Sequence, residues 1–485
     1  MSAQPDNPQF STLNSRLLKQ YWGYDRFRGI QEDIINSISE NKDTLGLMPT
    51  GGGKSITFQV PALAKDGLCL VITPLIALMK DQVQNLRKRG IKALAIYSGM
   101  NRQDIITTLE NCIFGNYKFL YISPERLDTE IFRIKLRKMK VSMITVDESH
   151  CISQWGYDFR PAYLKIAEIR ELLPDAPVLA LTATATPEVV KDIQTRLHFR
   201  RENVFRMSFE RNNLAYIVRK TENKTAELLH ILRSMPGSAI VYVRNRRRTK
   251  EITELLNNED ITADFYHAGL DDASKDIRQH RWQSGESRVM VATNAFGMGI
   301  DKSNVSYVIH YNMPKDLESY YQEAGRAGRD GLPSSCILLF SGQDVRTGEF
   351  LITHGDPREE LDAKTAELLR ERDLQRLRRM TAYCRTQRCL RQYLLQYFGE
   401  FASDYCGACY NCLHNFEEVD VSREAQIIVR CVAELGQHFG VGVVAETLCG
   451  ADTEKIRKFH MEREPSYGLL KDLTQVQVRE RIRFL

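Results

Sequence analysis

The sequence has no long hydrophobic run. No apolar stretch of its 485 residues approaches the roughly 20 residues that cross a bilayer, so we expect no membrane-spanning helix. The first twelve residues are polar, with neither a basic start nor an apolar centre, so we also expect no export signal. A strong excess of one charge is lacking as well, because the net charge is only +5. Such a mildly basic chain is compatible with nucleic acid as a partner but does not by itself indicate one.

The cysteines lack a disulfide pattern. Of the eleven, four lie close together near the C-terminal end and the others are scattered, which favours a reducing compartment. The four are Cys389, Cys406, Cys409 and Cys412, with the spacing C-x16-C-x2-C-x2-C. Four thiolates at such spacing are typical of a closed, structural zinc site with tetrahedral geometry. Spacing alone leaves Cys384 as a rival for the first ligand.

What is present indicates a globular chain with α/β organisation. With 43% hydrophobic and 27% charged residues, it is long enough for about three domains. Short apolar runs alternate with amphipathic segments, which indicates parallel sheets with helices on both faces. A first series of runs lies at 44–48, 68–72, 119–122, 143–146 and 178–181, and a second at 238–243, 262–266, 288–293, 305–310 and 335–340. Ligands of such sheets bind beyond the carboxyl ends of the strands.

A glycine-rich stretch follows the first apolar run and precedes a helix-like segment. Residues 48–55 read Met-Pro-Thr-Gly-Gly-Gly-Lys-Ser. Backbone N–H groups of such a loop and the helix N-terminus can surround phosphates, Lys54 can reach the β- and γ-phosphates, and Ser55 can ligate Mg²⁺. We therefore expect ATP to bind at Thr50, Gly51, Gly52, Gly53, Lys54 and Ser55. The alternative is a glycine-rich turn with a chance Lys-Ser pair.

An aromatic, an arginine and a glutamine lie close together before this loop, at Tyr24, Arg28 and Gln31. An aromatic ring and a cation can stack on a purine, and an amide offers both the donor and the acceptor that adenine needs. Ordinary helix entry and packing is the alternative for such a stretch.

Two adjacent carboxylates, Asp147 and Glu148, follow another predicted strand. Asp147 can hold Mg²⁺, and Glu148 can polarise the attacking water. His150 and the threonines of 182–186 are candidates for linking this site to the neighbouring domain, with a structural histidine as the alternative.

The segment 151–161, directly after the carboxylates, carries aromatics and an arginine in a loop-like run. Aromatics beside a cation suit single-stranded bases, so we expect Trp155, Phe159 and Arg160 to contact DNA. A buried aromatic plug is the alternative.

The second α/β unit has no glycine-rich loop of this kind, so we expect it to act as a partner of the first. Arg326 and Arg329 are three residues apart, which predicts one helical face that meets phosphate charge across a cleft. The turn-rich stretch 294–301 suits backbone contacts with phosphates. A salt-bridged surface helix is the alternative for the arginines.

Taken in order, these stretches resemble the superfamily two helicases, and specifically the RecQ family of DNA helicases. The resemblance covers about the first 340 residues: 23–31 looks like the adenine-reading motif, 48–55 like motif I and 73–82 like motif Ia. Further on, 147–150 looks like a DEAH-type motif II, 181–186 like motif III, 291–301 like motif V and 322–331 like motif VI. The aromatic-rich segment beside motif II points to RecQ rather than to RNA helicases.

The resemblance implies an α/β fold of two tandem RecA-like parallel-sheet domains at 1–206 and 207–342. A helical zinc-binding domain at 343–418 and a partial winged helix at 419–485 would follow. It implies Arg329 as an arginine finger with Arg326 as its companion, and Gln322 as a residue that helps to position the attacking water. It also favours Cys389 over Cys384, because residues 391–400 resemble the segment after the first zinc ligand in RecQ proteins.

The activity implied is that of an ATP-dependent DNA helicase, which moves 3′ to 5′ on single-stranded DNA and unwinds duplex DNA in repair and recombination. ATP, Mg²⁺ and Zn²⁺ are the implied cofactors. Single-stranded and duplex DNA are the implied partners, with a single-strand-binding protein as a further family partner. We expect a cytoplasmic monomer, associated with the nucleoid if the source is bacterial.

The C-terminal part is expected to be helical and basic. Residues 355–392 carry many arginines, most of which are explained by solvated helix faces. From residue 421 the chain resembles the start of a RecQ winged helix, with 453–462 as the candidate duplex-facing helix and a solvated basic face as the alternative. The sequence ends at Leu485, where the hairpin wing would continue, so we expect an incomplete winged helix and no HRDC domain.

Two other functions compete with this interpretation. The first is an RNA-dependent ATPase, against which the zinc cysteines and the aromatic-rich segment argue. The second is a zinc-containing DNA-binding protein with a decayed motor, against which the intact Lys54, Glu148 and Arg329 argue.

Overall fold

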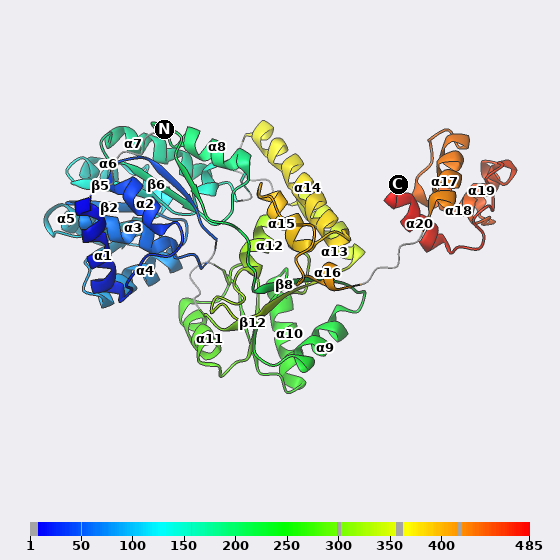
Figure 1. The fold of residues 1–485 in the computed structure, drawn as a ribbon, viewed down its shortest axis with the longest axis horizontal. Helices are drawn as coiled ribbons and strands as arrows, with labels where there is room; N and C mark the ends of the chain where they lie inside the picture. The colour runs from blue at the N-terminus through cyan, green and yellow to red at the C-terminus, as the bar shows by residue number, and fades with distance from the viewer. Residues whose placement is uncertain (1–7, 50, 157, 298–301, 356–361, 415–419) are drawn as a thin grey trace. The chain divides into compact units, whose positions relative to one another are not determined.

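The computed structural model describes residues 8–49, 51–156, 158–297, 302–355, 362–414 and 420–485. The chain divides into two compact units, Met1–His414 and Asn415–Leu485 (Figure 1). Among the described residues, no helix combines the length and the apolar character needed to cross a membrane.

The first sheet consists of seven parallel strands in the order β3-β4-β2-β5-β6-β1-β7. They are β1 (Thr44–Leu47), β2 (Leu68–Ile72), β3 (Ala93–Ile96), β4 (Phe119–Ile122), β5 (Val141–Val146), β6 (Val178–Thr182) and β7 (Val204–Arg206). Alternate residues of β2 face two separate cores, with Leu70 and Ile72 in one and Cys69 and Val71 in the other. Both faces are therefore buried, which explains why this strand is apolar throughout. The five predicted strands of this domain are confirmed, whereas the sequence does not predict β3 or β7.

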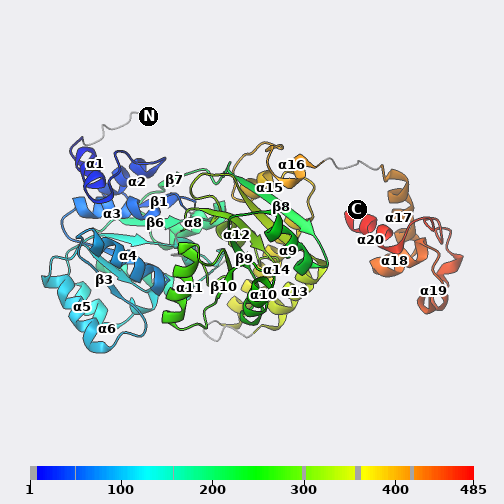
Figure 2. The ribbon, with the colours of Figure 1, turned by 90° about the horizontal axis from the view of Figure 1, so that it is seen from below.

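Eight helices described around this sheet complete the first RecA-like domain. They are α1 (Pro8–Trp22), α2 (Gln31–Ser39), α3 (Lys54–Ala64), α4 (Ile76–Lys88), α5 (Arg102–Phe114), α6 (Glu130–Leu136), α7 (Lys165–Leu172) and α8 (Pro187–Arg196). Figure 2 shows α1 to α3 near the β1 end of the sheet and α5 and α6 near the β3 end.

The second sheet has six parallel strands in the order β10-β11-β9-β12-β13-β8. They are β8 (Leu214–Lys220), β9 (Ser238–Tyr242), β10 (Ala263–Tyr266), β11 (Val289–Ala292), β12 (Val305–His310) and β13 (Ser334–Phe340). The helices of this domain are α9 (Lys224–Ser234), α10 (Arg246–Asn258), α11 (Asp272–Ser284) and α12 (Leu317–Ala324). All five predicted strands are confirmed, and β8 is an additional edge strand.

The helical region of the first unit consists of α13 (Gly342–His354), α14 (Ala363–Arg385), α15 (Leu390–Tyr397) and α16 (Tyr410–Leu413). The predicted helical stretch to residue 392 is interrupted, because α14 ends at Arg385 and Cys389 caps α15 by accepting from the Gln392 backbone N–H. Leu377 and Met380 of α14 pack into a core shared with the second sheet.

The second unit contains α17 (Ser422–Glu434), α18 (Val441–Leu448), α19 (Glu454–Lys458) and α20 (Gln475–Phe484). Its own core includes Ile428, Val444, Leu448 and Ile456. Over residues 420–485 the structure is helical without a wing strand, as expected for a partial winged helix. The predicted helix over 453–462 is too long, because His460 adopts a positive φ of 53° and separates α19 from a short 3₁₀ turn at Met461–Arg463.

Candidate active site

The glycine-rich loop lies between the end of β1 and the start of α3, where its sequence predicts a phosphate site. Gly51 and Gly53 have φ values of 86° and 76°, which a residue with a side chain rarely adopts. A Cβ built on Gly53 would lie only 2.3 Å from Nε2 of Gln31. The loop therefore needs glycine both for its backbone conformation and for space. Thr50 lies outside the described residues.

The side chain of Gln31 holds this loop through hydrogen bonds. Its side-chain N–H₂ donates to the carbonyl oxygens of Gly52 and Gly53, both at 3.2 Å, and its Oε1 accepts from the backbone N–H of Arg28 at 2.8 Å. The residue is 2% exposed. The Gln31 amide, which we expect to bind adenine, is therefore also hydrogen-bonded to both the phosphate loop and the segment before α2.

Tyr24 and Arg28 line one cavity together with Gln31 and the glycine-rich loop. The Arg28 guanidinium sits 5.3 Å from the centre of the Tyr24 ring, and Tyr24 is exposed. A ring and a cation so placed offer a stacking surface for a flat, polar ring.

Asp147 and Glu148 follow β5 and face Lys54. Lys54 Nζ lies 3.9 Å from Glu148 Oε1, and Thr73 donates a long hydrogen bond of 3.4 Å to Asp147 Oδ2. Desolvation raises the pKa of Asp147 to about 6, and the Glu148 carboxylate adds to this rise while Lys54 opposes it. Glu148 has a φ of 47°, a conformation that is uncommon for residues with side chains and that recurs at functional sites. Two carboxylates held this close favour a bound cation.

His150 and the threonines after β6 connect the two domains. His150 Nδ1 lies 2.8 Å from Thr182 Oγ1 and 3.4 Å from Glu148 Oε2. Burial lowers the pKa of His150 to about 3, so its ring is neutral at physiological pH. Gln322 of the second domain donates to Thr184 Oγ1 at 3.3 Å. The predicted link between the carboxylates and the second domain thus has a continuous set of contacts.

Arg326 and Arg329 lie in the same cavity as the glycine-rich loop. This cavity has a volume of about 740 Å³, and Gln322 also lines it. A Cβ built on Gly51 would lie 3.8 Å from Cγ of Arg329, so the stem of Arg329 lies against the loop. The prediction that both arginines share a helical face is wrong, because α12 ends at Ala324 and they follow in turns. Gly328, with a φ of 56°, breaks the helical path between them.

The aromatic-rich segment presents only some of its predicted contact residues. Trp155 is 51% exposed, whereas Phe159 is 9% exposed and packs inward. Arg160 donates to the Asp158 carboxylate at 3.1 Å and is partly buried. Tyr157 lies outside the described residues, as do residues 298–301 of the turn-rich stretch. Among the described aromatic residues of this segment, Trp155 is the one that offers a ring to solvent.

A second cavity, with a volume of about 770 Å³, also borders α12. Its lining includes Glu323 and His310, whose carboxylate and Nε2 are 2.9 Å apart. Arg244, after β9, and Asp373 of α14 also line it. Helix α12 therefore contributes to both cavities, with Gln322 in the first and Glu323 in the second.

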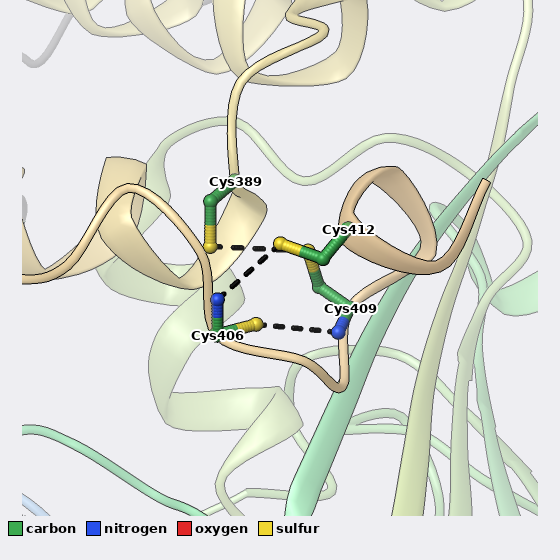
Figure 3. A group of neighbouring side chains, drawn as sticks. All are labelled: Cys389, Cys406, Cys409 and Cys412. Carbon is green, nitrogen blue, oxygen red and sulfur yellow. Dashed lines mark hydrogen bonds between the residues drawn. The ribbon is translucent and has the colours of Figure 1, made fainter. Parts of the chain in front are cut away.

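Four cysteine thiols converge at the end of the helical region (Figure 3). The Sγ atoms of Cys389, Cys406, Cys409 and Cys412 all lie within 4.8 Å of one another, and those of Cys389 and Cys409 are 3.9 Å apart. A tetrahedral site with Zn–S bonds of about 2.3 Å has S–S edges of roughly 3.8 Å, so this cluster fits zinc. Backbone N–H groups of Leu390 and Gln392 point at the sulfurs of Cys409 and Cys389 and would stabilise thiolates. Cys384 is buried at the end of α14 and is not part of the cluster.

The sequence does not predict that two further residues contact the aromatic-rich segment. Arg372 and Arg376 of α14 contact the backbone of residues 154–156, although the sequence suggests solvated helix faces for most arginines of this region. Their spacing of four residues, which places them on one face of a helix, is the only signal that could have singled them out.

Comparison with known proteins gives matches to four families. Residues 28–193 match "DEAD/DEAH box helicase", and residues 223–331 match "Helicase conserved C-terminal domain". Residues 342–413 match "RecQ zinc-binding", and residues 415–485 match "RQC domain".

Full-length relatives and solved structures agree with these matches. The chain is 44% identical to the ATP-dependent DNA helicase RecQ of Bacillus subtilis, over 97% of this chain and 78% of that protein. It is 37% identical to the ATP-dependent DNA helicase RecQ of Haemophilus influenzae, over 99% of this chain and 77% of that protein. Among solved structures, the Mycobacterium smegmatis helicase Lhr bound to single-stranded DNA and AMP-PNP has a similar fold, with a TM-score of 0.56 and 18% identity. That alignment covers 78% of this chain and 58% of Lhr.

Proposed function

The chain belongs to the RecQ family of DNA helicases, and we propose that its larger unit couples ATP hydrolysis in the 740 Å³ cavity to movement along single-stranded DNA. The chain is an ATP-dependent DNA helicase. One observation carries the proposed site: the glycine-rich loop, the carboxylate pair and Arg326 with Arg329 all line that cavity. These groups come from two sheets, so the cavity is where a change in ATP can alter the contact between the domains.

In this proposal the nucleotide base lies against Tyr24 and Arg28 and bonds to Gln31. The phosphates lie on the loop from Thr50 to Gly53, with Lys54 at the β- and γ-phosphates. Because the Gln31 amide holds the carbonyl oxygens of Gly52 and Gly53, base binding would also adjust the loop that holds the phosphates.

Hydrolysis would use groups from both domains. Ser55 and Asp147 would hold Mg²⁺, which supplies positive charge to the phosphates when it is bound. Glu148 would polarise the attacking water and Gln322 would help to position it. Arg329, with Arg326 as its companion, would stabilise the negative charge that develops on the γ-phosphate.

Single-stranded DNA would contact Trp155, Phe159 and Arg160. The exposed Trp155 ring supports a stacking role, whereas a contact from the buried Phe159 requires the loop to rearrange. We propose 3′ to 5′ movement, which predicts faster unwinding of a duplex with a 3′ single-stranded tail than of one with a 5′ tail. Binding should be largely electrostatic and weaken steeply with salt.

We assign the remaining roles to the domains proposed above, whose boundaries lie at residues 206, 342 and 418. We propose that Cys389, Cys406, Cys409 and Cys412 hold one structural zinc ion, and that residues 419–485 contact duplex DNA. We further propose a cytoplasmic monomer that acts in DNA repair and recombination alongside a single-strand-binding protein.

The decisive experiment measures ATP hydrolysis with and without single-stranded DNA, for the unaltered chain and for Lys54→Ala. We expect strong stimulation by DNA in the former and loss of hydrolysis in the latter. Single-stranded RNA of the same length serves as the comparison. Absence of stimulation by DNA would refute the proposal, and stronger stimulation by RNA would favour an RNA-dependent ATPase.

The role of the aromatic-rich segment has its own test. We expect Trp155→Ala to keep basal hydrolysis and to lose the coupling to DNA. Unchanged DNA-stimulated turnover in this variant would remove the proposed role of Trp155.

A further inference from the structure

Two arginines of α14 hold the backbone of the aromatic-rich segment. Arg376 Nη2 donates to the carbonyl oxygens of Trp155 at 2.7 Å and Gly156 at 2.8 Å. Its Nη1 donates to Asp373 at 2.8 Å on the same helix. Arg372 Nη1 donates to the carbonyl oxygen of Gln154 at 3.0 Å. Three successive carbonyl groups of the segment are therefore bound by a helix of the region that carries the zinc cysteines.

Arg372 also contacts the side chain of Trp155, which we expect to bind DNA. Its guanidinium carbon lies 3.6 Å from the centre of the Trp155 ring. In such a cation–π contact the positive charge is attracted to the electron-rich face of the ring. The guanidinium covers one face of the ring, and Trp155 nevertheless remains 51% exposed. The ring is thus held in one orientation and still accessible to a base.

Arg376 lies where the segment approaches the second domain. It is 8% exposed, so its charge needs the acceptors described above. Helix α14 packs on α12, since the rings of Tyr383 and Tyr320 lie 5.3 Å apart. Burial raises the pKa of Glu318, at the start of α12, and the Arg376 charge acts against this rise. The Glu318 carboxylate also accepts a hydrogen bond of 2.6 Å from the Tyr397 hydroxyl of α15. Arg376 is therefore near both the DNA-facing loop and the helix that carries Gln322.

We propose that Arg372 and Arg376 are positioning residues for DNA-coupled hydrolysis, which hold Trp155 ready for a base and connect its loop to α12. The inference rests on the proposed role of Trp155 in binding single-stranded DNA. The two arginines have different parts: Arg372 sets the orientation of the ring, and Arg376 sets the path of the backbone. Helix α14 thus belongs to the DNA-coupling apparatus and is not only a support for the zinc site.

The test compares Arg372→Ala, Arg376→Ala and Arg372→Lys with a control on the same helix, Arg378→Ala. Arg378 is exposed, and its substitution removes the same charge without touching residues 154–156. For each variant, hydrolysis is measured across a titration with single-stranded DNA, and zinc content confirms that the region is folded. We expect Arg372→Ala to raise the half-stimulating DNA concentration about tenfold, with Arg372→Lys recovering part of the loss because it keeps a cation over the ring. We expect Arg376→Ala to lower the ratio of DNA-stimulated to basal hydrolysis about tenfold, and Arg378→Ala to change neither quantity.

A double variant separates this inference from the function on which it depends. If Arg372 acts through Trp155, then adding Arg372→Ala to Trp155→Ala should cause no further loss. Additive losses, or an effect of Arg378→Ala equal to that of Arg372→Ala, would overturn the positioning role. If Trp155→Ala loses stimulation while the arginine variants keep it, only the present inference fails. If Trp155→Ala keeps full stimulation, the proposed role of the loop fails first.

Discussion

Of the three glycines in the phosphate loop, Gly53 has the least room for a side chain. Its φ of 76° and the Gln31 amide both oppose substitution. We expect Gly53→Ala to reduce ATP hydrolysis by about a hundredfold, because a shift of about 1 Å in a group that positions substrate has effects of that size. Steady-state hydrolysis at saturating ATP, with far-UV circular dichroism to check folding, measures the effect.

Gly90 provides a control for the backbone part of this effect. Its φ is 75°, nearly that of Gly53, but a Cβ there would meet no heavy atom within 4 Å. Gly90→Ala should therefore keep nearly full hydrolysis. Equal losses in the two variants would contradict a specific effect of the contact between Gly53 and Gln31, because Gly90 lies outside the phosphate loop and shares only the positive φ.

Glu318 makes the stability of the larger unit dependent on pH. Burial, followed by the charge of Asp316, raises the pKa of its carboxyl to about 7. A folded-state pKa above the unfolded value means that the protonated form is favoured in the fold, so this stability is complete below about pH 4.5 and is lost as pH rises through about 7. A rise of this size corresponds to roughly 3 kcal/mol.

Glu318→Gln should remove this dependence, because glutamine cannot ionise and still offers an oxygen to the Tyr397 hydroxyl. The difference between the thermal unfolding midpoints of the variant and the unaltered chain should therefore increase in favour of the variant from pH 5 to pH 8. A difference that stays constant over this range would show that Glu318 does not titrate there.

The end of helix α14 and the loop after α15 determine which cysteine thiols lie close enough to bind one metal ion. Because Cys389 lies beyond the end of α14, its thiol can turn toward Cys406, Cys409 and Cys412, whereas Cys384 packs into the core that α14 shares with the second sheet. We expect Cys389→Ala to lose the zinc ion and Cys384→Ala to keep about one per chain. Elemental analysis after gel filtration measures both, and zinc retained by the former but lost by the latter would exchange the two assignments.

The elements that could be predicted are those whose signals are local. The inner strands β2, β4 and β6 consist almost entirely of apolar residues, because both of their faces are buried. Strand β8 also begins with an apolar run, at 214–218, but only alternate residues of that run are buried, because the strand lies at the edge of its sheet. The helical spacing of Arg326 and Arg329 predicts a longer α12 than the structure has, because the helix ends at Ala324, before Gly325 and Gly328.

At the scale of the whole molecule, groups close in sequence could be predicted, whereas contacts between distant segments could not. The phosphate loop and the carboxylate pair are each contiguous, so their chemistry is visible without a structure. The hydrogen bonds from Arg372 and Arg376 to the aromatic-rich segment depend on how α14 packs against the first domain. The periodicity of the sequence does not specify this packing. The inward position of Phe159 has the same cause, since a loop residue is buried or exposed according to its neighbours in space.

We expect the division at residue 414 to separate ATP hydrolysis from the unwinding of duplex DNA. The unit Met1–His414 contains the ATP cavity, the Trp155 loop and the cysteine cluster, while Asn415–Leu485 has a hydrophobic core of its own. A chain that ends at His414 should therefore keep DNA-stimulated hydrolysis to within about twofold, because each unit can fold alone. Its unwinding of a tailed duplex should fall about tenfold or more, since a helical duplex-binding element would be lost. Fluorescence unwinding assays beside hydrolysis measure both, with Lys54→Ala in the shorter chain as the inactive control. Loss of stimulated hydrolysis in a shorter chain that retains zinc would place part of the coupling apparatus in the second unit.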